Sequence, residues 1–173
     1  MLIVVDMQND FIDGSLGTKE AQAIVPAVAA RIREYRAAGC PVVATQDTHG
    51  EDYLDTREGK YLPVRHCIRG TEGWQIRPEI LSLLQDCPIV EKPTFGSVRL
   101  PELVREWAKD ADKLSLEVIG LCTDICVVSN ALLLKASFPE ADLSVCAACC
   151  AGVTPQKHEA ALETMRSCQI NVM

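Results

Sequence analysis

Six short apolar runs, each bounded by polar or turn-forming residues, constrain the fold of this chain more than any other feature. Most segments between the runs show the 3.6-residue apolar period of amphipathic helices. We expect the runs to be buried strands, and they are Leu2–Val5, Pro41–Thr45, Cys87–Val90, Leu116–Leu121, Leu143–Ala148 and Ile170–Met173. The expected helices are Ala21–Ala38, Arg77–Gln85, Leu100–Lys109, Asp124–Lys135 and Pro155–Cys168. This alternation predicts a three-layer α/β/α fold with a central, mostly parallel sheet of about six strands.

Length and charge narrow the class of protein. The 173 residues suit one domain, and no repeat or break in composition divides them, so we expect a single domain over residues 1–173. The chain has 17 basic and 24 acidic residues, and this net charge of -7 argues against binding to nucleic acid or to an anionic membrane. No run reaches the roughly 18 apolar residues of a membrane span, and Met1–Val5 lacks the features of a signal peptide. A small-molecule partner is therefore expected.

The nine cysteines are an odd number, and several lie inside apolar, strand-like runs. This pattern is typical of reduced thiols and favours a cytoplasmic location over a secreted, disulfide-linked one. We expect most of them, including the group Cys146, Cys149 and Cys150, to be inert structural residues. We likewise expect His158, in the last predicted helix, to be a solvated side chain.

Polar side chains follow the strands at their carboxyl ends, where open parallel sheets bind ligands. Asp6 follows the first strand, Asp47 and His49 the second, Lys92 the third and Cys126 the fourth. Cys126 lies at a strand-to-helix switch, and the N–H groups and dipole of a first helical turn favour a thiolate. A carboxylate beside the thiol accepts its proton, and an ammonium group stabilises both negative charges. Asp6, Lys92 and Cys126 are therefore candidates for the base, its electrostatic partner and the nucleophile.

Three segments resemble the motifs of the isochorismatase-like cysteine hydrolases and, within that superfamily, of the nicotinamidases. The segments are VVDMQNDF at Val4–Phe11, EKPTFGS at Glu91–Ser97 and GLCTDICV at Gly120–Val127. The resemblance implies that Asp6 is the general acid/base, Lys92 the third member of the triad and Cys126 the nucleophile. It also implies a cis peptide just before Cys122, with the backbone N–H groups of Cys122 and Cys126 forming an oxyanion hole.

The same resemblance separates amide hydrolysis from other reactions of the superfamily. Members that cleave the vinyl ether of isochorismate lack the nucleophilic cysteine, so Cys126 favours an amidase. Asp47 and His49, followed by His66, resemble the nicotinamidase metal site, and such N and O ligands accept zinc, iron or manganese. We expect zinc. In the resembled enzymes the ion binds the pyridine nitrogen and leaves the amide carbonyl over the thiol, so it anchors the substrate.

The fourth metal ligand of nicotinamidases lies between the two histidines, inside the long irregular segment His49–Gly73. Long connections of this kind are usually functional. Asp52, Asp55 and Glu58 are the candidates there. We favour Glu58, which lies nine residues beyond His49, because its long side chain can reach back to a metal site that the loop itself forms.

Aromatic side chains near these motifs are candidates for holding a flat substrate ring. The available residues are Phe11, Tyr61, Trp74 and Phe95. At least two of the four are expected to be ordinary core residues. We assign Phe11, Trp74 and Phe95 to substrate binding.

The sequence thus predicts a metal-containing amidohydrolase that converts nicotinamide, or a similar small aromatic amide, to the acid and ammonia through a Cys126 thioester. Two alternatives stay open. The first is a metal-free cysteine amidase that acts on a carbamoyl or ureido compound. The second is a non-catalytic relative used as a binding module, although all three triad residues are present. The resemblance also implies a homo-oligomer.

Overall fold

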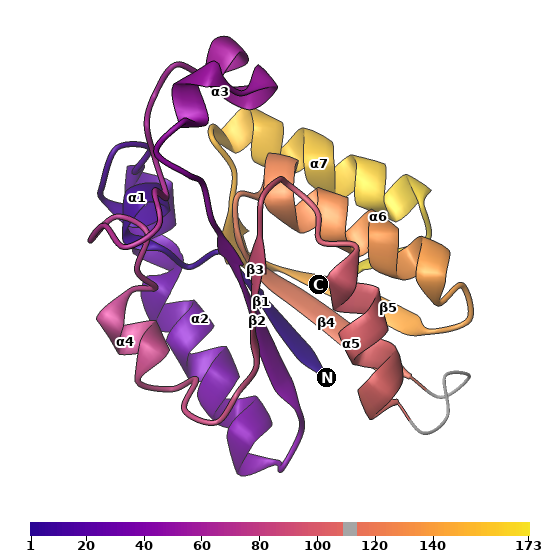
Figure 1. Ribbon diagram of the computed structural model, residues 1–173. Coiled ribbons are helices and arrows are strands. Elements are labelled where there is room, and N and C mark those ends of the chain that lie inside the picture. The colour runs from indigo at the N-terminus through magenta and orange to yellow at the C-terminus, as the bar shows by residue number, and fades with distance from the viewer. Residues whose placement is uncertain (109–113) are drawn as a thin grey trace.

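The structure is a computed structural model that describes residues 1–108 and 114–173. Within these ranges, six strands form one sheet in the order β3-β2-β1-β4-β5-β6, and all five neighbouring pairs are parallel. The strands are β1 (Leu2–Val5), β2 (Val42–Asp47), β3 (Ile89–Lys92), β4 (Ser115–Leu121), β5 (Asp142–Ala151) and β6 (Asn171–Val172). The predicted three-layer fold is therefore confirmed (Figure 1).

Helices cover both faces of the sheet (Figure 1). One face carries α1 (Asn9–Ile12), α2 (Lys19–Ala37) and α4 (Pro78–Leu81), and the other carries α5 (Arg99–Trp107), α6 (Val128–Ser137) and α7 (Pro155–Ser167). Alternation along β1 divides its side chains between two apolar cores, with Leu2 and Val4 in one and Ile3 and Val5 in the other. None of the helices in the described ranges combines the length and the apolar character needed to span a membrane.

Three strands, β2, β3 and β5, extend beyond their expected carboxyl ends, and the extensions of β2 and β3 place two of the predicted site residues within the sheet. β2 ends at Asp47 and β3 ends at Lys92, two residues beyond each expected end. Asp47 and Lys92 are register partners on these neighbouring strands. Because register partners point to the same face of a sheet, their side chains are brought together by the strand pairing itself.

All five expected helices differ from the observed ones in their bounds. The ends of those expected at Ala21–Ala38 and Pro155–Cys168, which are α2 and α7, shift by only one or two residues. The helix expected at Arg77–Gln85 is wrong in extent, because only α4 is regular and the chain then turns through Asp86, whose φ is +64°, to enter β3. The helix expected from Asp124 begins as a π-helical turn, Thr123–Val127, which we call the Cys126 turn, and continues as α6. The helix expected at Leu100–Lys109 is α5, and Lys109 lies outside the described residues.

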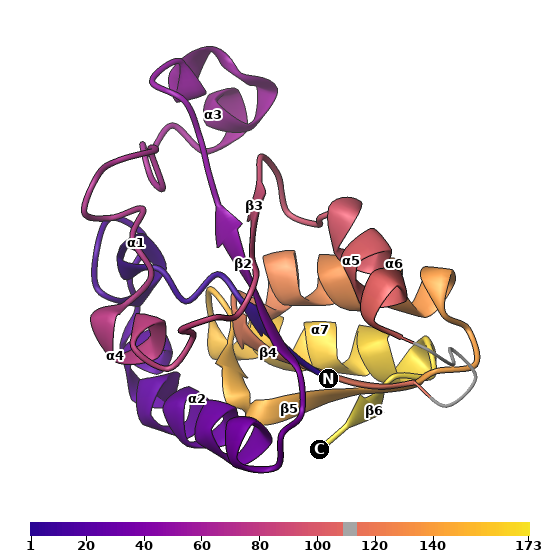
Figure 2. The same cartoon turned by 60° about the horizontal axis from the view of Figure 1, so that its bottom comes forward.

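The segment His49–Gly73 contains two short helices that the periodicity does not predict. These are a 3₁₀ helix, Tyr53–Asp55, and α3 (Arg57–Tyr61). The side chain of Thr56 caps α3 by accepting the N–H of Gly59 at 3.0 Å. Figure 2 shows α3 standing above the carboxyl ends of the strands, so the segment folds over the edge at which the polar residues gather.

Candidate active site

Asp6, Lys92 and Cys126 meet at the carboxyl edge of the sheet, and all three side chains are buried. The Nζ atom of Lys92 lies 2.7 Å from Oδ2 of Asp6 and donates to Sγ of Cys126 at 3.4 Å. Thr45 donates its hydroxyl to Oδ1 of Asp6 at 2.7 Å, which fixes the carboxylate from the neighbouring strand. The structure therefore brings the three residues into one contact group.

Burial and mutual charge shift the proton affinities within this group. Burial raises the pKa of Asp6, while the ammonium group of Lys92 opposes the rise. Burial and the Asp6 charge raise the pKa of Cys126 well above its ordinary value, so the resting group is a thiol. Burial alone would lower the pKa of Lys92, but the negative charge of Asp6 outweighs it and raises the pKa. A thiol beside a carboxylate and an ammonium group is arranged for transfer of its proton to Asp6.

The Cys126 turn presents the thiol from the end of β4. The peptide between Leu121 and Cys122 is cis, as the resemblance implies. The carbonyl of Cys122 accepts the N–H groups of Ile125 and Val127, each at 3.1 Å, so the turn closes around Cys126. Asn130, which is fully buried in α6, donates to the Cys126 carbonyl at 2.8 Å and holds the turn from the side of the helix.

Asp47, His49 and His66 form a second group beside the first. Each offers one ligand atom within 4.8 Å of the others, and all three are buried. Oδ2 of Asp47 lies 3.0 Å from Nε2 of His49 and 3.8 Å from Nε2 of His66. The Nδ1 atom of His66 contacts the Val64 carbonyl at 2.8 Å, which leaves Nε2 facing the group.

Glu58 completes this group from α3. Its Oε1 atom lies 3.7 Å from Nε2 of His49 and 3.9 Å from Nε2 of His66. Bond lengths of about 2.0–2.2 Å place the N and O ligands of a tetrahedral zinc ion roughly 3.3–3.5 Å apart. The four separations between a carboxylate oxygen and a histidine nitrogen, from 3.0 to 3.9 Å, fit such an ion with small adjustments.

Asp47 joins the two groups. Its Oδ2 atom faces the histidines, while Oδ1 accepts a hydrogen bond from Lys92 at 3.0 Å. Burial alone would raise the pKa of Asp47, but the hydrogen bond to His49 and the charge of Lys92 outweigh it and lower the pKa. Asp47 is therefore a carboxylate that belongs to both groups.

A small cavity of about 40 Å³ opens onto both groups. Its lining includes Cys126, Cys122, Asp47, Glu58 and His66, together with Phe11, Leu16, Leu62, Phe95 and Ile125. Two of the three residues assigned to substrate binding, Phe11 and Phe95, line this cavity. Trp74 does not, because its indole N–H donates to the Thr48 hydroxyl at 2.8 Å and its ring packs beside Arg69, away from the cavity.

Sequence reasoning missed several residues of the site. Gln8 is fully buried and pairs with the backbone of Asp47 in both directions, donating to its carbonyl at 2.8 Å and accepting its N–H at 2.7 Å. Gln8 lies inside the first motif, so that motif held a usable signal. Leu16 and Leu62 lie in irregular segments, where the sequence pattern gives no indication that a residue lines the cavity. His158, expected to be solvated, instead lies 2.8 Å from the Thr123 hydroxyl.

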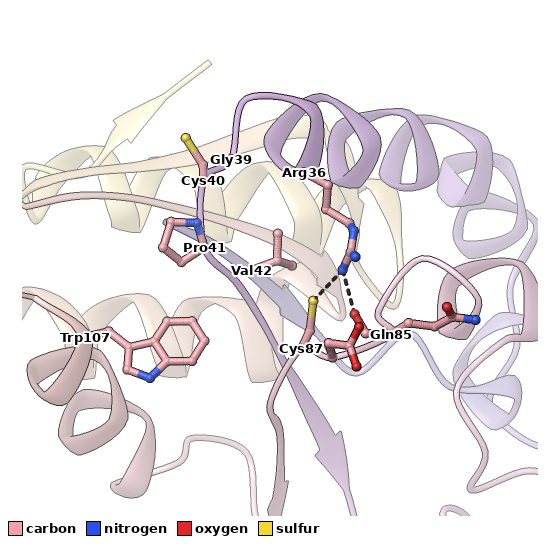
Figure 3. Close-up of a pocket in the computed structure, with 9 residues that line it drawn as sticks. Arg36, Gly39, Cys40, Pro41, Val42, Gln85, Cys87 and Trp107 are labelled. Atoms are coloured by element: carbon pink, nitrogen blue, oxygen red, sulfur yellow. Dashed lines mark hydrogen bonds between the residues drawn. The ribbon is translucent and has the colours of Figure 1, made fainter.

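Another cavity, of about 290 Å³, lies at the opposite edge of the sheet, where residues 39–42 lead into β2 and residues 85–87 approach β3. Figure 3 shows the Arg36 guanidinium directed at Cys87 and Gln85, with Trp107 across the cavity. The described residues that line it include no histidine. The candidate nucleophile, base and metal-binding side chains therefore lie at the carboxyl edge and not in this cavity.

Known proteins resemble this chain over nearly its whole length. The nicotinamidase/pyrazinamidase of Mycobacterium tuberculosis is 28% identical over 190 residues, which cover 99% of this chain and 97% of that protein. The structure of the pyrazinamidase of Pyrococcus horikoshii in complex with zinc superposes with a TM-score of 0.85 at 29% identity, covering 99% of this chain and 97% of that one. The N-carbamoylsarcosine amidase of Thermoplasma acidophilum superposes with a TM-score of 0.77 at 28% identity, covering 99% and 93%.

The sequence profile of the isochorismatase domain matches residues 1–173. This match covers both residue groups and every strand that positions them. The sheet order and the placement of Asp6, Lys92 and Cys126 at the carboxyl ends of three of its strands agree with the resemblance found in the three sequence motifs. The chain belongs to the isochorismatase family.

Proposed function

We propose that this protein is an amidohydrolase that converts nicotinamide, or a similar small heteroaromatic amide, to the carboxylic acid and ammonia. The observation that carries the proposal is the position of Asp47, which contacts Lys92 with one oxygen and faces His49 and His66 with the other. One carboxylate thus couples a cysteine-centred contact group to a set of metal ligands. The similarity to nicotinamidases and pyrazinamidases supports the same substrate class.

Each member of the contact group has a distinct role in the proposed reaction. Asp6 accepts the Cys126 proton as the thiolate attacks the amide carbonyl, and the backbone N–H groups of Cys122 and Cys126 stabilise the oxyanion. Asp6 then returns the proton to the leaving ammonia, and a thioester remains on Cys126. Asp6 next activates water, which cleaves the thioester and releases the acid. Lys92 keeps Asp6 ionised and stabilises the thiolate.

Asp47, His49, Glu58 and His66 are proposed to hold a divalent metal ion, in the first instance zinc. The buried N and O donors fit zinc, and the zinc complex of the pyrazinamidase of Pyrococcus horikoshii supports this choice. When bound, the ion supplies a Lewis-acid contact for the ring nitrogen of the substrate. Phe11, Leu16, Leu62 and Phe95 line the cavity with apolar side chains, and apolar and aromatic side chains favour contact with a flat ring.

The test is ammonia release from nicotinamide by purified protein, with and without prior chelation. Cys126→Ala is expected to abolish release, whereas Cys40→Ala, which removes an exposed thiol far from the site, should leave it unchanged. Chelation should lower release, and adding zinc back should restore it. Normal turnover by Cys126→Ala would refute the mechanism.

A second candidate is a metal-free amidase for carbamoyl compounds, which the similarity to an N-carbamoylsarcosine amidase supports. Metal analysis of the purified protein discriminates between the two. The second candidate predicts no stoichiometric metal and release of ammonia from a carbamoyl amino acid that persists after chelation. A non-catalytic binding module would hydrolyse neither class of compound.

We propose one domain over residues 1–173, a cytoplasmic location and a homo-oligomer. All nine cysteines lie in the described residues and carry free thiols, which suits a reducing compartment. Exposed apolar side chains such as Tyr61 and Val98 suit burial between subunits. Light scattering coupled to size-exclusion chromatography measures the oligomeric state directly.

A further inference from the structure

The Cys126 turn is held on two sides by side chains from different helices. On the side of α6, Asn130 donates to the Cys126 carbonyl at 2.8 Å and accepts the N–H of Ser97 at 2.9 Å. On the side of α7, Oγ1 of Thr123 and Nδ1 of His158 are 2.8 Å apart. Figure 1 shows α6 and α7 lying next to each other on the same face of the sheet. The first residue of the turn is therefore tied to one helix and its cysteine to the other.

The start of α7 packs tightly against the turn. The Asp124 carboxylate accepts the N–H of Val153 at 2.9 Å, which joins the turn to the loop before α7. A Cβ atom at Gly152 would lie 2.8 Å from the backbone nitrogen of His158 and 2.9 Å from Oδ1 of Asp124. This close approach requires glycine at position 152, and it sets His158 directly beside Thr123.

Thr123 needs the partner that this packing supplies. Its side chain is fully buried, and a buried hydroxyl without a hydrogen bond costs about 1–3 kcal/mol. His158 is half-buried and lies near the first turn of α7, where its ring reaches inward while its neighbour Glu159 stays exposed. The hydrogen bond therefore fixes Thr123, which follows Cys122 directly and precedes Cys126 by three positions.

We propose that His158 is a positioning residue for Cys126, acting through the hydroxyl of Thr123. It touches no reacting atom. Instead, it holds the start of the Cys126 turn so that the thiol stays within reach of Asp6 and Lys92. The inference rests on the proposed function in one respect, namely that Cys126 is the nucleophile. A displacement of about 1 Å at a reacting group lowers a rate by roughly 100-fold, so one hydrogen bond at this position has a measurable effect.

The test compares Thr123→Val, Thr123→Ser, His158→Ala and the Thr123→Val/His158→Ala double variant in the full chain. Glu159→Ala is the matched control, because it removes a neighbouring side chain that is exposed. Three quantities are measured: kcat and KM for nicotinamide, the melting temperature, and the rate at which iodoacetamide alkylates Cys126, followed by mass spectrometry of its peptide. The alkylation rate requires no substrate, so it tests the inference independently of the proposed reaction.

We expect Thr123→Val and His158→Ala each to lower kcat by about 10- to 100-fold, with KM changed by less than about twofold. The double variant should be no slower than the slower single one, because both changes break the same hydrogen bond. Alkylation of Cys126 should slow in the same variants, and Thr123→Ser and Glu159→Ala should behave as the wild type.

Folded His158→Ala with unchanged kcat and unchanged alkylation would overturn the inference, as would a double variant whose losses multiply. If Thr123→Val does not fold, the result for His158→Ala is sufficient, because the His158 side chain is half-exposed and its removal should not prevent folding. If the wild type releases no ammonia from nicotinamide, the proposed function fails, and the alkylation rates still support or overturn the role of His158.

Discussion

The ammonium group of Lys92 lies 2.7 Å from the Asp6 carboxylate, and neither side chain is accessible to solvent. The same nitrogen lies 3.0 Å from Asp47. A single buried cation thus separates two buried carboxylates, one from each residue group of the site. Because Asp47 and Lys92 are register partners in the sheet, the strand pairing itself places their side chains next to each other.

Replacing Lys92 with Met should destabilise the fold as well as stop turnover. The change leaves Asp6 and Asp47 buried without their shared cation, and breaking a buried ion pair on one side costs about 3–5 kcal/mol. Urea unfolding gives the free energy directly, with Lys19→Met as a control for loss of an exposed lysine. A Lys92→Met protein as stable as the wild type would show that the carboxylates are neutral or solvated.

Metal should stabilise the folded protein through the four donors. A ligand that binds only the folded state raises the free energy of unfolding by about 2.7 kcal/mol when its free concentration is 100 times its dissociation constant. Chelation should therefore lower the melting temperature, and added zinc should restore it. His66→Ala removes one buried donor and should abolish the response to zinc. His158→Ala, which removes a histidine outside the group, should keep it. An equal zinc response in the two variants would place the ion elsewhere.

The sequence predicts the site best where the fold follows from periodicity alone. Asp6, Lys92 and Cys126 each follow an apolar run, and parallel strands bring their carboxyl ends to one edge, so the order of apolar and polar residues predicts that all three lie at that edge. Their contact depends on the strand order β3-β2-β1-β4, which the sequence pattern does not predict. The exact strand ends are less predictable, because the apolar runs stop before Asp47 and Lys92 while the backbone pairing continues through both.

Contacts across irregular segments are not predictable from periodicity. Trp74 lies near the motifs in sequence, but its ring contacts Thr48 and Arg69 and so lies away from the cavity. His158 has charged neighbours in the sequence, yet Gly152 lets its helix approach Thr123 closely enough for a hydrogen bond. Both outcomes depend on tertiary packing, which local patterns do not encode.

Gly120→Ala should lower the free energy of unfolding and kcat far more than Gly39→Ala does, although both glycines have positive φ. At Gly39, where φ is +67°, an added Cβ meets nothing within 4 Å, so the expected cost is the conformational one of about 1 kcal/mol. At Gly120, where φ is +118°, the added Cβ would lie 2.1 Å from the Val5 carbonyl oxygen. The β1–β4 pairing next to Asp6 must then shift. Urea unfolding and kcat of both variants check this, and equal losses would contradict it.

Stability should fall as the pH rises above about 8.5, because buried thiols stay protonated in the folded state. Burial, followed by the charge of Asp124, raises the pKa of Cys122 to about 12. Burial, followed by a hydrogen bond to Cys146, raises the pKa of Cys149 to about 12. Unfolded thiols ionise near pH 8.5, so between about pH 8.5 and 12 the unfolded chain loses protons that the folded chain keeps. Each such thiol lowers the free energy of unfolding by about 1.4 kcal/mol per pH unit in that window.

Urea unfolding between pH 7 and pH 10.5, with a reductant present, measures this slope. Below pH 8 the contribution of these thiols is constant, so the decline should begin only above that value. Cys149→Ala removes one raised pKa and should make the decline shallower, whereas Cys40→Ala, which removes an exposed thiol, should alter the slope less. Equal slopes in the wild type and Cys149→Ala would mean that the Cys149 thiol ionises as easily in the folded protein as in the unfolded chain, which its burial beside Cys146 opposes.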